Sequence, residues 1–192
     1  MDGQKRGDTV IFSVQKVAHM AAFFLARREG PMSHLKLIKL MYLADRLSME
    51  RYDAPMSDDA QYSMKNGPIL SNTLNLLRGV TRDDVWSDLI SPVNDNQVKL
   101  SREFDWDELD ELSRAELVIL DEVFAEFGRM KRWEIVNHTH TLLEWVDPGR
   151  SCRPIDSALT FKSFGASDAL ARDKSAMLIT RQALGQKLHE MS

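Results

Sequence analysis

The chain has 192 residues, of which 43% are hydrophobic and 28% are charged, and its net charge is −4. This length favours one domain with at most a small appendage, and the interspersed charges argue against nucleic acid as the main partner. Cys152 is the only cysteine, so an internal disulfide and a multi-cysteine metal site are both excluded. Because we find neither a signal-peptide pattern nor a run long enough to span a bilayer, we expect a cytoplasmic protein without a membrane partner.

The first predicted element is a helix over residues 12–28, where apolar residues recur at helical spacing until Gly30-Pro31 stops the pattern. The second is a helix over residues 35–51, which Ser33 is placed to cap. The short link between them predicts an antiparallel pair.

The helix over residues 35–51 is apolar around most of its circumference, which is typical of a buried helix about which the other elements pack. Its basic residues Lys36, Lys39 and Arg46 fall in one narrow strip. We interpret that strip as a solvated helix face, in preference to a nucleic-acid surface. Asp45 projects opposite it, among apolar residues, and needs a hydrogen-bonding partner or a route to water.

Residues 61–64 predict a short strand that leads into a turn at Asn66-Gly67-Pro68. Gly67 is expected to adopt an unusual backbone conformation, and Pro68 to open a helix that ends at Gly79. Residues 97–100 have strand character and are expected to pair with residues 61–64 in a two-stranded ribbon. The predicted fold is therefore mainly α, a compact helical bundle with a small ribbon, and an α+β assignment is possible.

The second half of the chain predicts three more helices. Ser113 and Glu116 form a capping box before a helix that Gly128 ends, and a further helix covers residues 131–143. From residue 168 onward, Leu170, Met177 and Leu184 recur seven residues apart in a strong helical pattern. We expect residues 1–150 to form the main domain, and residues 151–192 to form a helical extension packed on it.

The order of three motifs resembles the Panacea antitoxin domain of SocA-like proteins. These motifs are KLMYLADR at residues 39–46, NGPI at residues 66–69, and Thr139-His140 followed by Trp145. The resemblance spans roughly residues 14–147. It implies an antitoxin that binds a cognate protein toxin directly, and some members of this family act as adaptors that deliver the toxin to a ClpXP-type protease. Homodimer formation is compatible with this interpretation.

No familiar catalytic motif accompanies the resemblance, so we expect neither an enzyme nor a cofactor. His138 and His140 suggest a metal pair, but on a helix they point about 200° apart, and we expect no metal. Two alternatives stay open. The chain could be a phage- or prophage-encoded protein-binding module that acts on another host factor, or an unfamiliar enzyme that uses His140 and Asp45.

The candidate site residues divide into two groups. Asp45 is expected to lie near Thr139 and His140, either as a buried hydrogen-bonded pair or as part of a recognition site. The second group follows the ribbon, whose open edge is a place where a partner strand can add. Tyr62 is the expected anchor there, unless it packs inward and the C-terminal helix covers the edge. The candidate residues are Asp45, Tyr62, Met64, Lys65, Gly67, Pro68, Thr139, His140 and Trp145.

Overall fold

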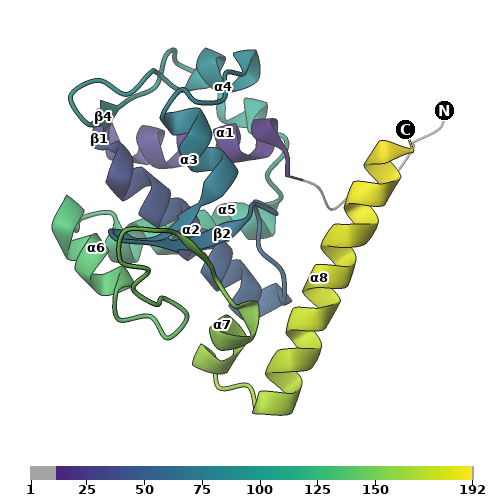
Figure 1. The fold of residues 1–192 in the computed structure, drawn as a ribbon. Coiled ribbons are helices and arrows are strands. Elements are labelled where there is room, and N and C mark those ends of the chain that lie inside the picture. The colour runs from purple at the N-terminus through teal and green to yellow at the C-terminus, as the bar shows by residue number, and fades with distance from the viewer. Residues whose placement is uncertain (1–11, 192) are drawn as a thin grey trace.

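The computed structural model describes residues 12–191, which form a mainly helical fold with short antiparallel strands (Figure 1). This is the predicted fold class. No helix in the described range is both long and apolar enough to cross a membrane. In chain order the elements are α1 (Val14–Arg28), β1 (Met32–Ser33), α2 (His34–Tyr52), β2 (Gln61–Met64), β3 (Gly67–Leu70), α3 (Ser71–Leu77), α4 (Asp84–Leu89), β4 (Gln97–Val98), the 3-10 helix η1 (Trp106–Glu108), α5 (Arg114–Phe127), α6 (Arg132–Thr139), β5 (Arg153–Pro154), α7 (Ser157–Ser163) and α8 (Asp168–Glu190).

Helix α2 is the centre of the fold, as its apolar circumference predicts. Every residue from Lys36 to Asp45 is buried, and the helix contacts α1, α5, α6 and β3. A helix surrounded in this way stabilises the fold mainly by removing its apolar side chains from water.

The helix ends confirm one predicted cap and correct another. Ser113 accepts a hydrogen bond from the backbone N–H of Glu116, and the Glu116 carboxylate bonds back to Ser113, which is the capping box expected at the start of α5. At α2, however, the Ser33 side chain makes no capping hydrogen bond. Residues 32–33 are instead strand β1, which pairs with β4.

The strand pairing differs from the prediction. Residues 97–98 pair with β1, whereas β2 lies between β3 and β5 in a three-stranded antiparallel sheet. Pro68 does not open a helix, because residues 67–70 form the fully buried strand β3 opposite β2, and α3 begins only at Ser71. The fixed φ of proline suits an extended strand as well as a helix start, so local sequence alone could not separate the two.

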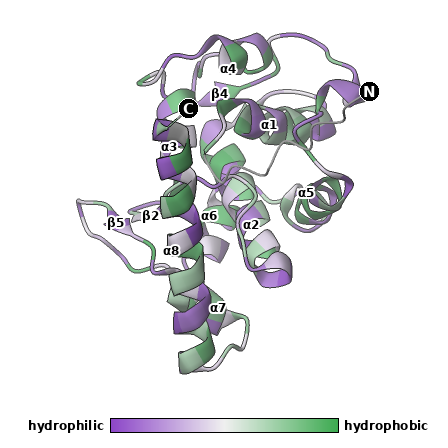
Figure 2. Cartoon of the chain, turned by 90° about the vertical axis from the view of Figure 1, so that its right-hand side faces the viewer, coloured by the Kyte–Doolittle hydropathy of each residue, from purple (hydrophilic) through white to green (hydrophobic). Residues whose placement is uncertain are grey.

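The C-terminal part of the chain is attached to the body at several points. Strand β5 pairs with β2, and Ala171 and Leu178 of α8 share a small apolar cluster with Met49 and Phe161. Helix α6 ends at Thr139, earlier than expected, and the following residues form a loop. In Figure 2, α8 lies in front of the body and carries both hydrophobic and hydrophilic residues. The division into two parts at residue 150 stays a prediction.

Candidate functional site

The turn between β2 and β3 brings together residues from three distant segments. Gly67 follows the turn with φ of 94°, in the region that favours glycine. A Cβ atom at this position would lie 2.6 Å from Thr139 Oγ1 of α6 and 3.0 Å from Lys39 Nζ of α2. Gly67 is therefore required both by its backbone conformation, as predicted, and by the close approach of these two side chains. We call residues 64–68 the clamped turn.

Lys39 of α2 holds the clamped turn at its β3 end. Its side chain is fully buried, and Nζ donates a hydrogen bond of 2.6 Å to the carbonyl oxygen of Pro68. Burial lowers the pKa of Lys39 from 10.5 to about 7, because a charged ammonium loses its hydration there. The prediction of a solvated basic strip is wrong at Lys39 and also at Lys36, whose buried Nζ donates to the carbonyl oxygen of Gly128.

Trp145, with His140 stacked on it, holds the turn at its β2 end. Their rings stack with centroids 4.0 Å apart, and the indole Nε1 of Trp145 donates to the carbonyl oxygen of Met64 at 3.1 Å. Burial, followed by the nearby Lys39 charge, lowers the pKa of the His140 imidazole, whose Nε2 is buried without a hydrogen-bond partner among the described residues. Side chains from two distant segments, α2 and residues 139–145, thus fix the backbone on both sides of the turn.

The predicted pair of Asp45 and His140 is not formed. Asp45 is fully buried and accepts hydrogen bonds from the backbone N–H and the hydroxyl of Ser57. Burial raises the pKa of its carboxyl to about 7, although the Ser57 hydrogen bonds act in the opposite direction. Asp45 therefore attaches the loop that follows α2 to the helix itself. The prediction was right that this carboxylate needs a partner and wrong about which residue supplies it.

The residues of the three sequence motifs consequently meet at one turn. A family model described as "Antitoxin SocA-like, Panacea domain" matches residues 37–146, which is more than half of the chain. The chain belongs to this family. No curated protein and no solved structure matches it significantly. The matched region begins in α2 and ends directly after Trp145, so the Panacea domain includes the clamped turn and the side chains that hold it, whereas β5, α7 and α8 lie outside the match.

Sequence reasoning missed a buried carboxylate in the Panacea domain. One oxygen of Glu144, Oε1, accepts hydrogen bonds from the Tyr42 hydroxyl at 3.1 Å and from Arg46 Nε at 2.8 Å. Its second oxygen has no hydrogen-bond partner within the described residues. Arg46 also donates to Ser163 of α7, so this group connects the loop after α6 to the C-terminal part. The available signal was Arg46 itself, a charged side chain on a helix whose circumference is mostly apolar.

The open edge expected on residues 61–64 is absent, because β2 is paired on both sides. Strand β5 covers the edge, rather than the C-terminal helix that we considered. Tyr62 is half-buried and packs against the main core, and Met64 is likewise half-buried. Of the predicted contact residues in the Panacea domain, Lys65 is the one that is exposed, beside Asn66 at the tip of the turn.

The two histidines considered as a metal pair face different neighbours. His138 lies against the ring of Phe127, with centroids 4.8 Å apart, while His140 stacks on Trp145. Within residues 12–191, no group of three or more His, Cys, Asp or Glu side chains is arranged to hold a metal ion.

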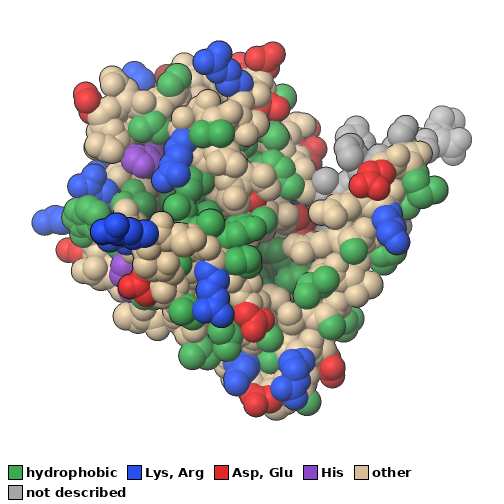
Figure 3. All heavy atoms as spheres, viewed as in Figure 1, with side chains coloured by type: hydrophobic (Ala, Val, Ile, Leu, Met, Phe, Trp, Pro, Cys, Tyr) green, Lys and Arg blue, Asp and Glu red, His purple; other side chains and the backbone are tan. Residues whose placement is uncertain are grey.

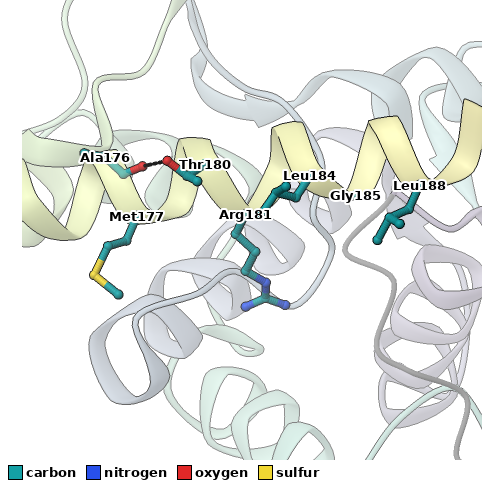
Figure 4. Close-up of a pocket in the computed structure, with 7 residues that line it drawn as sticks. All are labelled: Ala176, Met177, Thr180, Arg181, Leu184, Gly185 and Leu188. Carbon is teal, nitrogen blue, oxygen red and sulfur yellow. Dashed lines mark hydrogen bonds between the residues drawn. The ribbon is translucent and has the colours of Figure 1, made fainter.

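A groove of about 510 Å³ runs along α8, away from the motif residues (Figure 4). Its lining comprises Ala176, Met177, Thr180, Arg181, Leu184, Gly185 and Leu188.

Proposed function

We propose that this protein is an antitoxin that neutralises a cognate protein toxin by binding it directly. Membership of the SocA-like family supports a role of this kind. The observation that carries the proposal is that the motif residues converge on the backbone of one exposed turn. Lys39 and Trp145 both donate to main-chain carbonyls, which fixes the backbone of this turn before a partner binds.

An enzyme that uses His140 and Asp45 together receives no support from this geometry. Asp45 is hydrogen-bonded to Ser57, whereas His140 is stacked on Trp145. General acid–base chemistry requires the two groups to reach a common substrate, which these partners do not favour. We therefore expect no catalytic activity of the chain itself.

Co-expression tests the proposal. Each open reading frame next to this chain's gene is induced in bacterial cells, with and without the full chain, and growth and co-purification are measured. We expect one neighbouring product to stop growth, to be neutralised by this chain, and to co-purify with it. If no neighbouring product is both toxic and neutralised, the antitoxin proposal is wrong. Neutralisation of a toxin that never co-purifies would contradict direct binding.

Delivery of the toxin to a ClpXP-type protease is a finer form of the same proposal. The toxin level in rescued cells distinguishes an adaptor from an antitoxin that acts by binding alone. It is measured in a normal host and in a host that lacks the protease. An adaptor lowers the toxin level only where the protease is present, and rescue is lost without it. An antitoxin that acts by binding alone rescues both hosts and leaves the toxin level unchanged.

A further inference from the structure

The tip of the clamped turn combines exposure with a fixed backbone. Lys65 and Asn66 are exposed, yet the carbonyls of Met64 and Pro68 on either side accept hydrogen bonds from Trp145 and Lys39. Two exposed side chains are thus presented on a turn whose conformation is already set. Binding through such a turn loses little conformational entropy, which favours affinity.

Two exposed aliphatic side chains lie in the loop attached to this turn. The exposed fractions of Leu143 and Val146 are 54% and 40%. The loop is held against β2 because Trp145 donates to Met64, and because the backbone N–H of Val146 donates to Ser63 Oγ at 3.4 Å. Aliphatic side chains kept exposed beside a rigid turn are typical of the apolar centre of a protein interface.

Exposed basic side chains lie on the segments that meet at this apolar centre. Arg153 lies opposite Ser63 in the pairing of β5 with β2, and Arg150 and Lys65 are exposed nearby in the sequence segments that meet here. Asp147, the exposed carboxylate of the same loop, accepts a hydrogen bond from the backbone N–H of Gly149. Figure 3 shows hydrophobic side chains next to Lys and Arg side chains over α6 and β2. Among these exposed side chains Lys65, Arg150 and Arg153 outnumber Asp147, although the net charge of the whole chain is −4.

We infer that the partner-binding surface consists of Lys65, Asn66, Leu143, Val146 and Arg153, and that it takes a protein segment with apolar side chains flanked by carboxylates. This inference rests on the proposed antitoxin function and names the contact surface for it. It replaces strand addition at β2, whose backbone groups are already paired. The aliphatic centre favours a protein over a nucleic acid, since a phosphate backbone offers no apolar counterpart.

Two variants of the full chain test the surface. Leu143→Asp removes the apolar centre, and the double variant Lys65→Glu with Arg153→Glu reverses the charge. Val80→Asp and the double variant Arg78→Glu with Arg82→Glu are matched controls, because Val80 is 72% exposed and both arginines are exposed outside the proposed surface. The probe is the purified product of the adjacent open reading frame, and association and dissociation rates are measured by surface plasmon resonance after the unfolding midpoint of each variant has been checked.

We expect Leu143→Asp to weaken binding by about tenfold or more, mainly by faster dissociation. The charge-reversed variant should associate about tenfold more slowly at low salt, and this difference should shrink at high salt. Both controls should bind as the wild type does. If the surface variants bind like the controls, the surface is wrong while the antitoxin function stands. If the wild type binds only a DNA duplex and not the neighbouring product, the inference and the proposed function both fail.

Discussion

Replacing Lys39 by methionine keeps an unbranched side chain that is one atom shorter, and it removes the charge and the hydrogen bond. In the wild type this fully buried ammonium donates to the Pro68 carbonyl oxygen, and its pKa is lowered to about 7 from 10.5. Between these two values the unfolded chain binds a proton at Lys39 that the folded protein does not. The unfolding free energy of the wild type therefore rises as pH increases from about 7 towards 10.5. This gain in stability is lost again as pH falls towards 7.

The size of the effect follows from the two pKa values. At about 1.4 kcal/mol for each pKa unit, keeping Lys39 charged in the folded protein costs on the order of 5 kcal/mol. From about pH 7 to about pH 9.5, roughly 3 kcal/mol of this cost disappears. In the methionine variant the Pro68 carbonyl loses its donor, which costs about 1–3 kcal/mol at every pH. Lys39→Met should thus be more stable than the wild type near pH 7 and lose that advantage in alkali.

Urea unfolding of both proteins at the two pH values, followed by tryptophan fluorescence, measures this directly. The difference in unfolding free energy between the wild type and Lys39→Met should change by about 3 kcal/mol in favour of the wild type as pH rises. Groups whose pKa does not depend on Lys39 cancel in this comparison. If the two proteins respond to pH in parallel, Lys39 does not have a lowered pKa and the account of its burial is wrong.

Three further substitutions test the core and the site. Gly67→Ala should lower the unfolding free energy by about 2–4 kcal/mol, through its positive φ and through collision with the side chains that hold the turn, as measured by the urea midpoint. The pKa of Asp45 is raised to about 7, so between about pH 4 and 7 the folded protein binds a proton that the unfolded chain has released. The unfolding free energy of the wild type should therefore fall over this range, and Asp45→Asn should flatten this dependence in the same assay. Leu40→Asp should abolish soluble expression, because an unpaired buried charge costs several kcal/mol out of a total of roughly 5–15; Val80→Asp, at an exposed position, is its control.

Local physics predicted several features of this protein from the sequence. A mostly apolar circumference was sufficient to place the helix over residues 35–51 at the centre of the fold, because only a narrow strip of such a helix favours water. The capping box at Ser113 and the positive φ of Gly67 were predictable because each depends on residues within one turn of chain. The motif order also predicted the family, which the match over residues 37–146 shows.

Tertiary structure decided the pairing of the strands and the partners of the buried polar groups. Strands of two to four residues carry too little pattern to select a partner, so β2 pairs with β3 and β5 while residues 97–98 pair with β1. Lys39 was placed in a solvated strip because a helical projection shows which side chains share a face, but not what covers that face. Asp45 bonds to Ser57 rather than to His140, because the path of the loop after α2 determines which donor reaches this carboxylate. That path depends on contacts between residues far apart in the chain.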